Sequence, residues 1–328
     1  MRSPPIEPHL GQRVTVVVVN WNRWPETLAC VEALSRSVGT RFRVIVVDNA
    51  SDEAAASHAL ERVQDVEIVQ AGANLGYAGG NNLGLSIALD SGDPYVWVLN
   101  NDTVPAPDSM AELVKCMEAD PRLGVLTSSV LSPDGDWEPG NAIRVAEPRN
   151  WSIDRATGQV VCEGCADAQA GHRADIVRGP SLFFRSAALA EVGVFDERYF
   201  HYFEEMDLVE RLRRAGWGAA LACRSRVVHQ HGGTLSHLTP QSMYYLHRNQ
   251  LLFRKKIYGE GVARGLSTDL LRRLRALGAP RYLLRGEFRV TSAQALGIID
   301  AARGRTGQRD LGPRYRRPVE LKHRPPHA

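Results

Sequence analysis

Two acidic clusters carry the chemistry that this sequence offers most clearly. Asn100-Asn101-Asp102 directly follows the apolar run Tyr95-Val96-Trp97-Val98-Leu99, and Glu204-Glu205-Met206-Asp207 comes much later in the chain. An acidic side chain beside an Asn at the end of a buried strand suits a hard divalent cation that shares its oxygen ligands with phosphate. A second acidic group in the same crevice can transfer a proton. Each cluster alone is better explained as a turn or a helix start, so it is their joint setting that predicts an active site.

The elements that must position these clusters are read from runs of β-branched residues that alternate with amphipathic segments. The expected strands of the first part are Arg13–Val19, Arg43–Val47, Val66–Gln70 and Tyr95–Leu99. The expected helices are Trp24–Ser37, Asp52–Arg62 and a segment that follows the Gly-rich loop Asn74–Asn82 and runs to Ser91. This alternation predicts an α/β fold whose central sheet is mostly parallel, with right-handed crossovers and flanking helices.

The second part of the chain is less regular. We expect a helix over Met110–Ala119, strands over Gly124–Leu131, Leu182–Arg185 and Ala219–Val228, and a helix from Glu204 to Ala215 that ends at Gly216. Residues 132–174 are rich in Gly, Pro and Asp, which predicts an insertion or a loop over the site.

Small polar residues follow each of the first strands. The clusters are Asn20-Trp21-Asn22, Asp48-Asn49-Ala50-Ser51, Asn74-Leu75-Gly76 and Asn100-Asn101-Asp102. Because the carboxyl ends of parallel strands share one edge of the sheet, these clusters should converge on a single crevice. Asn and Asp offer the donors and acceptors that read a base and a ribose, so we expect a nucleotide site. For Trp21, Trp97 and Trp217 we favour core packing over stacking on a sugar.

Seven motifs in this order resemble the inverting glycosyltransferases of family 2, which use the GT-A (nucleotide-diphospho-sugar transferase) fold. They are VVVVNWNR, VVDNASDE, NLGYAGGNN, VLNNDT, RGPSLFFR, FDERYFHYFEEMDLVERLRRAGW and HQHGG. The resemblance covers Val14–Phe253. The similarity is to bacterial rhamnosyltransferase-like enzymes of cell-surface polysaccharide synthesis. It implies transfer of a sugar, with rhamnose as the candidate, from a nucleotide-diphosphate donor to a hydroxyl of a glycan or lipid-linked glycan.

The resemblance also implies a role for individual residues. Glu205 is the expected catalytic base, and Asp102 and His229 are the expected ligands of Mg²⁺ or Mn²⁺. The residues expected to bind the nucleotide sugar are Asn20, Arg23, Asp48, Asn49, Asn74, Gly76, Asn82, Asn100 and Asn101. Gly179, Pro180 and Glu204 are expected on the acceptor side. Arg248 is expected to contact the diphosphate, with a solvated helix face as the equal alternative, and Asp207 is expected to brace Arg211.

The expected organisation follows from these motifs. Residues 1–12 form an N-terminal tail, and residues 13–238 form the GT-A catalytic domain. Its nucleotide-sugar-binding half covers residues 13–110, and its acceptor and catalytic half covers residues 111–238. A helical basic region covers residues 239–312, and residues 313–328 form a disordered tail.

Charge and composition bound the partners. The net charge of +3 hides an asymmetry, because residues 251–328 contain 18 of the 40 Lys and Arg but 6 of the 37 Asp and Glu. The Arg- and Leu-rich stretch Phe253–Arg289 fits a helix on an anionic membrane surface and equally a helix that packs on the catalytic domain. No run reaches the ~18 apolar residues that span a bilayer, and the N-terminus does not resemble a signal peptide. We therefore expect a cytoplasmic protein, peripheral on the inner face of the membrane.

Two alternatives and one minor motif remain open at this point. A sugar-nucleotide pyrophosphorylase-like enzyme needs a Gly-rich basic loop after the first strand, where this chain has Asn-Trp-Asn. A binder of anionic polymers through the basic tail conflicts with the acidic remainder of the chain, and we expect no nucleic-acid partner. Five cysteines are a poor disulfide framework, and Cys162-Glu163-Gly164-Cys165 lacks the second pair that a zinc site needs.

Overall fold

The structure is a computed structural model, and it describes most of the expected elements. It covers residues 13–52, 60, 63, 65–135, 142–143, 151–154, 159–162, 172–174, 176–177, 179–230, 239–259 and 288–316. The predicted N-terminal tail, most of the helix Asp52–Arg62, most of residues 132–174 and residues 260–287 lie outside these ranges. The chain divides into two compact units. The first unit is Met1–Glu197 with Glu204–Gly233, and the second is Arg198–Phe203 with Thr234–Ala328.

The first unit is built on a mixed sheet, which confirms the predicted α/β class. Its described strands follow the order β10-β13-β6-β12-β4-β1-β2-β3, and β5 pairs with β13. Strands β3, β2, β1 and β4 form a parallel block, while β12 runs antiparallel to both of its neighbours, β4 and β6. The bounds are β1 Arg13–Asn20, β2 Arg41–Asp48, β3 Val66–Gln70, β4 Tyr95–Asn100, β5 Thr103–Pro105, β6 Leu123–Leu131, β10 His172–Ala174, β12 Ser181–Arg185 and β13 Gly218–His229. Two short pairs, β7 Ala142–Ile143 with β11 Ile176–Val177 and β8 Trp151–Asp154 with β9 Gln159–Cys162, complete the described strands of this unit.

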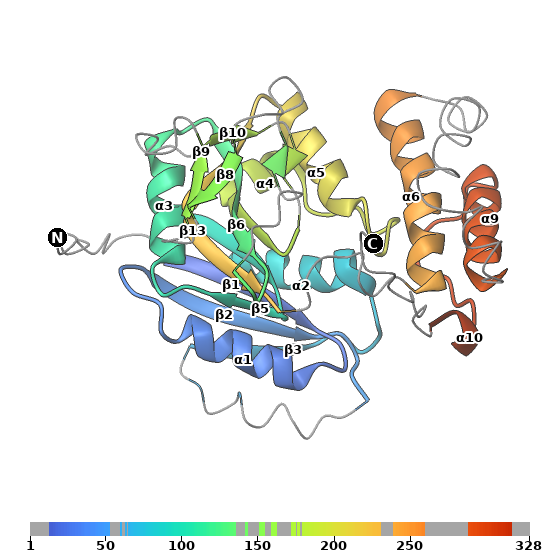
Figure 1. Cartoon of the computed structure of the whole chain (residues 1–328), viewed down its shortest axis with the longest axis horizontal. Helices are drawn as coiled ribbons and strands as arrows, with labels where there is room; N and C mark the ends of the chain where they lie inside the picture. The colour runs from blue at the N-terminus through green and yellow to red at the C-terminus, as the bar shows by residue number, and fades with distance from the viewer. Residues whose placement is uncertain are drawn as a thin grey trace, which may run out of the picture. The chain divides into compact units, whose positions relative to one another are not determined.

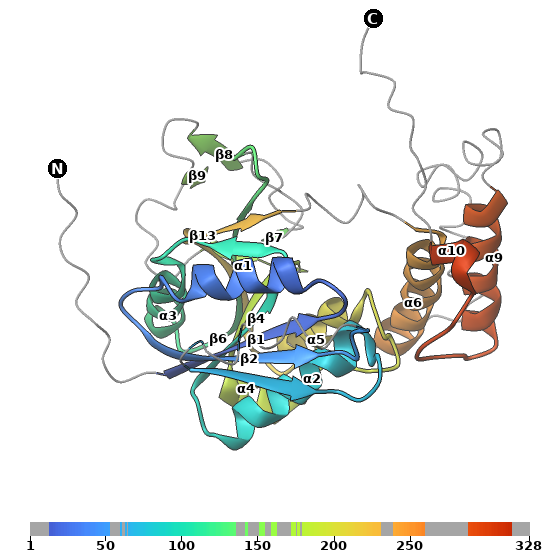
Figure 2. The same cartoon turned by 90° about the horizontal axis from the view of Figure 1, so that it is seen from below.

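Helices cover both faces of this sheet (Figures 1 and 2). Helices α1 Trp24–Leu34 and α3 Ser109–Ala119 pack on one face, and α2 Gly76–Asp90, α4 Ser186–Val192 and α5 Glu204–Arg214 pack on the other. Strand β1 serves both cores, because successive side chains of a strand point to opposite faces. Val16 and Val18 pack in the core under α1 and α3, and Val17 packs in the core under α2.

Helix α2 differs from the sequence prediction, because the Gly-rich segment is helical from Gly76 onward instead of forming a loop up to Asn82. The glycines allow the helix to lie directly against the sheet. A Cβ on Gly80 would stand 2.9 Å from Cγ1 of Val19, and one on Gly84 would stand 2.4 Å from Cγ1 of Val17. Glycine is therefore needed here so that the helix can pack against the strand. Of the loop predicted over Asn74–Asn82, only Asn74 and Leu75 precede α2.

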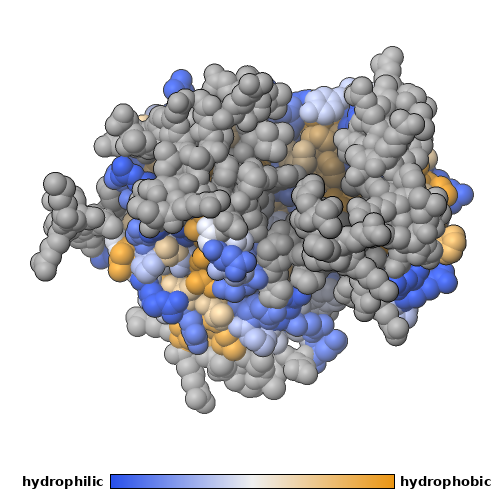
Figure 3. Space-filling model, viewed as in Figure 1, coloured by the Kyte–Doolittle hydropathy of each residue, from blue (hydrophilic) through white to orange (hydrophobic). Residues whose placement is uncertain are grey.

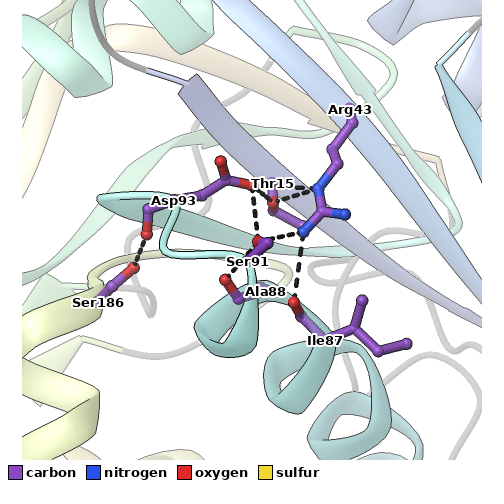
Figure 4. A network of polar contacts seen from close by, with 7 residues as sticks. All are labelled: Thr15, Arg43, Ile87, Ala88, Ser91, Asp93 and Ser186. Atoms are coloured by element: carbon purple, nitrogen blue, oxygen red, sulfur yellow. Dashed lines mark hydrogen bonds and ion pairs between the residues drawn. The ribbon is translucent and has the colours of Figure 1, made fainter.

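A buried polar network pins the amino ends of the central strands (Figure 4). Thr15 of β1 donates to Asp93, and Nε of Arg43 from β2 donates to Oγ1 of Thr15 at 2.9 Å and to Oδ2 of Asp93 at 3.1 Å. Ser186, the first residue of α4, donates to the backbone carbonyl of Asp93 at 2.5 Å. The network thus joins β1, β2, the turn before β4 and α4, at the end of the strands opposite to the polar clusters.

The second unit is helical in its described part. It contains α6 Pro240–Tyr258, α9 Phe288–Ala302 and α10 Pro313–Arg316. Tyr244, Tyr245, Ala293 and Tyr315 form its buried apolar cluster. The short helix α10 and the burial of Tyr315 differ from the expectation of a disordered tail that begins at residue 313. Within the described ranges, no helix combines the length and apolar content that crossing a bilayer requires.

One of the described cysteines is paired, although five cysteines are a poor disulfide framework. Cys30 and Cys116 are buried free thiols, and burial raises the pKa of each to about 12. Cys223 in β13 is disulfide-bonded. The side chains of the Cys162–Cys165 motif lie outside the described residues.

Candidate active site

The polar clusters meet along one edge of the sheet, as the parallel topology requires. In the β1–β2 ladder Asn20 is the register partner of Asp48, and in the β1–β4 ladder Val19 is the partner of Asn100. The carboxyl ends of three adjacent strands therefore lie side by side. The structure brings Asn20, Asp48 and the Asn100–Asp102 turn to one place.

Asn20 organises the loops at this edge from a fully buried position. Its Nδ2 donates to Oγ of Ser51 at 3.0 Å and to Oδ1 of Asp48 at 3.4 Å. Its Oδ1 accepts hydrogen bonds from Oγ1 of Thr27 at 2.8 Å and from the backbone N–H of Arg23 at 3.3 Å. Nδ2 of Asn101 in turn donates to Oγ1 of Thr27 at 3.0 Å. The amide of Asn20 is thus used within the protein. Ser51 belongs to one of the polar clusters expected here, whereas the part played by Thr27 was not expected.

Trp21 is exposed, so the expectation that it packs in the core is wrong. Its side chain is 49% exposed, whereas Trp97 is fully buried. The loop that carries it is fixed on its far side, where Asn22 adopts a left-handed φ of 55°. Asn22 and Asp52 exchange two hydrogen bonds, of 2.7 and 3.1 Å, and the N–H of Asn22 donates to Oγ of Ser51. The loop that is fixed in this way carries a flat apolar ring that is half exposed to solvent.

Asn49 holds the loop before α2 in place. Its Nδ2 donates to Oδ1 of Asn74 at 3.1 Å and to the carbonyl of Gly76 at 3.0 Å, and its Oδ1 accepts from the N–H of Leu75 at 2.9 Å. Asn74 Oδ1 also accepts from the N–H of Gly76 at 2.9 Å. These hydrogen bonds shape the loop that was expected to line the nucleotide sugar.

Asn82 connects α2 to the segment that contains Phe195 and Glu197. Its carboxamide exchanges hydrogen bonds with the backbone of Phe195, at 2.9 and 3.0 Å, and donates to Oε1 of Glu197 at 2.9 Å. The structure thus uses Asn82 to position a segment that precedes the second acidic cluster. Its partners lie more than a hundred positions away in sequence, so the residues next to Asn82 could not have predicted these hydrogen bonds.

Asp102 and His229 are brought together by the pairing of β5 with β13. His229 is the register partner of Thr103, and the N–H of Gln230 donates to the carbonyl of Asp102 at 2.8 Å. As a result, Nε2 of His229 lies 3.3 Å from Oδ1 of Asp102. The two residues proposed as metal ligands from the sequence are therefore neighbours in space.

The residues at this turn fit a hard divalent cation. Two adjacent ligands of an octahedral ion at 2.0–2.1 Å stand about 3 Å apart, close to the Asp102–His229 separation. Oδ1 of Asn100 is buried and has no hydrogen-bond partner among the described residues. In the same part of the chain, no three or more His, Cys, Asp or Glu side chains gather closely enough to hold a metal by themselves. An ion that takes its remaining ligands from a diphosphate and water needs no such cluster.

The second acidic cluster begins helix α5. Glu204 is 3% exposed, and burial, together with the negative charge of Glu205, raises its pKa well above the ordinary value. Asp207 is buried and accepts a hydrogen bond of 2.8 Å from Nε of Arg211, which confirms the predicted brace. Arg211 also donates to the carbonyls of Val192 and Val194. These hydrogen bonds fix the C-terminal half of α5 to the segment after α4.

Tyr77 connects the two acidic clusters, and the sequence analysis did not single it out. Burial raises the pKa of its phenol well above the ordinary value, and the charges of Glu205, Glu204 and Asp102 raise it further. The charges of both acidic clusters thus shift the pKa of one phenol in the same direction. Its ring packs edge-on against Phe195, with a centroid distance of 5.9 Å. The Tyr within the NLGYAGG motif was the available signal.

Pro180 is hydrogen-bonded to the end of β4 through its backbone carbonyl. The carbonyl of Pro180, which follows Gly179 with its left-handed φ of 103°, accepts a hydrogen bond of 2.8 Å from the N–H of Asn100. The side chain of Arg23 is half exposed and pairs with Glu26 at 3.2 Å.

Arg248 lies in α6 of the second unit and is fully buried. Three of its nitrogens donate to Asn249 and to backbone carbonyls of that unit. This arrangement gives Arg248 a structural role and provides no support for a contact with a diphosphate or for the alternative of a solvated helix face.

Comparison with known proteins gives a consistent result at the level of sequence. Residues 15–178, half of the chain, match the family described as Glycosyl transferase family 2. The chain is 30% identical over 232 residues to the N-acetylglucosaminyl-diphospho-decaprenol L-rhamnosyltransferase of Mycobacterium tuberculosis, which covers 65% of this chain and 75% of that protein. It is 21% identical over 300 residues to the low-salt glycan biosynthesis hexosyltransferase Agl10 of Haloferax volcanii, covering 90% and 92% of the two chains.

Solved structures share the fold. TarS 1-349 of S. aureus superposes with a TM-score of 0.56 at 13% identity, over 89% of this chain and 81% of that one. The mannosyltransferase PcManGT of Pyrobaculum calidifontis, in complex with GDP-Man and Mn²⁺, gives a TM-score of 0.54 at 18% identity, over 91% and 88% of the chains. The order of the motifs, the edge of the sheet at which they meet and these matches lead to one conclusion: the chain belongs to glycosyl transferase family 2 and is a glycosyltransferase with a GT-A fold.

Proposed function

We propose that this enzyme transfers a sugar, with rhamnose as the first candidate, from a nucleotide-diphosphate donor to a hydroxyl of a lipid-linked glycan. The acceptor class is the one that the name of the mycobacterial relative states, and the setting is cell-surface polysaccharide synthesis. One structural observation carries the proposal. Asp102 and His229 lie 3.3 Å apart at the edge of the sheet where β1, β2 and β4 end side by side, and this pair of candidate metal ligands supports metal-assisted transfer from a nucleotide-diphosphate donor.

The nucleotide of the donor is assigned to the edge formed by the β1 and β2 loops. Asp48 uses Oδ1 for its hydrogen bonds with Ser51 and Asn20, and the hydrogen bonds of the described residues do not involve Oδ2. This oxygen can accept a hydrogen bond from the base. The exposed ring of Trp21, which follows Asn20 on the neighbouring strand end, offers a stacking surface.

Asp102 and His229 are the residues that would hold Mg²⁺ or Mn²⁺, and the buried Oδ1 of Asn100 belongs to the residue two positions before Asp102. When bound there, the ion stabilises the charge that develops on the departing diphosphate. Asn101 and Thr27 fix the turn that carries these groups, so that it is formed before the donor binds.

Glu205 accepts the proton of the acceptor hydroxyl as that oxygen attacks the anomeric carbon from the side opposite to the diphosphate. This single displacement inverts the anomeric configuration. Burial and the negative charge of Glu205 raise the pKa of Glu204, which favours a neutral Glu204 beside a charged Glu205 over two repelling carboxylates. Neutral Glu204 can then donate a hydrogen bond on the acceptor side.

A lipid-linked acceptor also requires access to a membrane. We place the enzyme in the cytoplasm, peripheral on the inner face of the cell membrane, with the basic second unit toward anionic lipid. The charge of residues 251–328 supports this proposal, although most of the Arg- and Leu-rich stretch lies outside the described residues. Family membership removes the pyrophosphorylase-like and polymer-binding alternatives.

The decisive experiment combines a donor screen with two variants. A panel of nucleotide sugars is screened by thermal shift with Mn²⁺, and turnover is then measured for the donor that binds. Glu205→Gln should retain donor binding and lose about 10²–10⁴-fold in turnover, the usual contribution of a positioned base. Asp102→Ala should abolish the dependence of donor affinity on Mn²⁺. Near wild-type turnover of Glu205→Gln, or an unchanged metal titration of Asp102→Ala, contradicts the corresponding assignment.

A further inference from the structure

The backbone directly before the acidic helix α5 is strained. Phe200, Tyr202 and Phe203 have φ values of 65°, 67° and 75°, in the left-handed region that residues with a Cβ rarely adopt. Phe203 is followed without a linker by Glu204 and Glu205. Strained residues of this kind persist only where surrounding structure holds them, and they gather at functional sites.

Two fully buried polar side chains of α6 hold this segment by its backbone carbonyls. Nδ2 of Asn249 lies within hydrogen-bond distance of the carbonyl oxygens of Tyr199, His201 and Tyr202, at 2.8, 2.7 and 2.9 Å. Nη2 of Arg248 donates to the carbonyl of Tyr199 at 2.9 Å, and its Nε donates to Oδ1 of Asn249 at 2.8 Å. The two side chains therefore form one clamp.

Aromatic contacts fix the same segment to the same helix. Phe200 stacks on Tyr245 with a centroid distance of 5.3 Å and an interplanar angle of 26°. The ring of Phe203 lies 5.7 Å from that of Phe253. The guanidinium of Arg248 lies 4.9 Å from the centroid of Tyr245, on which Phe200 stacks.

Helix α9 packs closely against helix α6 at Tyr244 and Arg248. A Cβ on Gly297 of α9 would stand 2.5 Å from the carbonyl oxygen of Tyr244 and 3.2 Å from the backbone N of Arg248. The two helices thus pack at backbone distance beside the clamp residues. Nη1 of Arg248 also donates to the carbonyl of Gly307 beyond α9, at 2.5 Å.

We infer that Arg248 and Asn249 are positioning residues for the catalytic base. They hold the strained segment Arg198–Phe203 in one conformation, and a change in that conformation is passed along the chain to Glu205, two residues after Phe203. The inference rests on the proposed role of Glu205. It replaces the expected contact of Arg248 with the diphosphate, and it explains why a charged side chain is fully buried in the second unit. A carboxylate at the second residue of a helix moves with the start of that helix, and displacement by about 1 Å can cost ~10²-fold in rate.

The test compares Asn249→Ala with a matched control in the same helix. The probe is the nucleotide sugar selected by the thermal-shift panel, with water as acceptor where no glycan is transferred. Asn249→Ala should lower kcat by about 10- to 100-fold while the donor Kd stays within about twofold, because the donor site lies in the first unit. Hydrogen exchange of a peptide covering residues 198–205 should become faster. Tyr244→Phe removes a buried hydrogen bond of 2.8 Å to Asp300 and should change neither kcat nor this exchange.

Two further variants keep the outcome clear. Arg248→Lys retains the charge but not the planar fork, and it provides an intermediate loss of kcat if Asn249→Ala does not fold. Combining Asn249→Ala with Glu205→Gln should give no loss beyond that of Glu205→Gln alone. Wild-type kcat in Asn249→Ala, or fully additive losses in the double variant, would overturn the positioning role. Turnover that survives Glu205→Gln would instead overturn the proposed function, whatever Asn249→Ala shows.

Discussion

Adjacent carboxyl groups at the start of α5 are made unequal by burial. Glu204 is 3% exposed, while Glu205 is partly exposed. Desolvation disfavours the charged form of Glu204, and the negative charge of Glu205 adds to the same shift. The pair therefore divides into a neutral acid and a charged base through its surroundings, although the two side chains are chemically identical.

This division predicts that Glu204→Gln is far milder than Glu205→Gln, because an amide imitates a neutral carboxyl group. It also predicts a change in the pH dependence of stability. The raised pKa of Glu204 means that the folded state binds more protons than the unfolded state above pH 4.5, so this group lowers stability as the pH rises toward the folded pKa. The free energy of unfolding, measured against pH, should fall less steeply in Glu204→Gln than in the wild type. Identical slopes would show that Glu204 is ionised in the folded protein.

Trp21 yields a second prediction at this scale. An exposed indole on a fixed loop contributes little to folding, so Trp21→Ala should leave the melting temperature unchanged. If the ring stacks on the base, the variant should bind the nucleoside diphosphate about 5- to 150-fold more weakly, equivalent to ~1–3 kcal/mol. Isothermal titration calorimetry measures this difference. Val38→Ala, at another exposed apolar residue, is the control, and unchanged affinity in Trp21→Ala would remove the stacking role.

At the scale of elements, the short motif in α2 both packs the helix on the sheet and positions residues of the site. Gly80 and Gly84 face Val19 and Val17 of β1, and the polar residues Asn81 and Asn82 lie between these two glycines in the sequence. The first turn carries Tyr77 toward the acidic groups, while Asn82 holds the segment at Phe195. Close packing of the helix on the sheet is therefore a condition for the geometry of the site.

Gly84→Ala tests that condition. In an exposed helix this change would stabilise by up to ~1 kcal/mol, but here the new methyl group would stand 2.4 Å from Val17. We expect a net loss of about 1–3 kcal/mol in the free energy of unfolding, since Val17 is buried in a central strand. Adding Val17→Ala should recover part of it, and Ser86→Ala, on the exposed side of α2, should have no effect. A stabilised Gly84→Ala protein would show that α2 does not approach β1 this closely.

The strands and the carboxylate sites were predictable because their signals are local. A β-branched run such as Val14–Val19 identifies a strand buried on both faces, and a parallel order then places Asn20, Asp48 and Asn100 at one edge. The start of α2 was not predictable, because the need for Gly84 comes from Val17, far away in sequence. The same holds for Asn249, whose amide binds carbonyls almost fifty positions away. A side chain that serves a distant backbone segment has the same local pattern as one that serves a ligand.

At the scale of the whole molecule, opposite charges are separated along the chain. The first unit carries the acidic active-site groups, and exposed basic residues such as Lys255 and Lys256 lie at the end of α6 in the second unit. Apolar side chains are exposed there as well, namely Tyr258, Phe288 and Ile299. In Figure 3, hydrophobic and hydrophilic residues lie side by side at the right-hand edge, where Figure 1 shows α9. Neighbouring basic and apolar side chains are what the proposed contact with anionic lipid would use.

A membrane-facing second unit predicts salt-sensitive binding of the full chain to vesicles. Each Lys or Arg near an anionic surface contributes about 1 kcal/mol, so Lys255→Gln with Lys256→Gln should weaken binding to phosphatidylserine-containing vesicles by about 30-fold. Sedimentation at low and high salt measures the effect, and purely zwitterionic vesicles should bind little of either protein. Arg36→Gln with Arg41→Gln removes the same charge from the exposed surface of the first unit and should bind like the wild type. If both double variants lose affinity equally, net charge rather than the second unit directs the protein to the membrane. If the wild type does not bind anionic vesicles at low salt, the enzyme meets its lipid-linked acceptor without this surface.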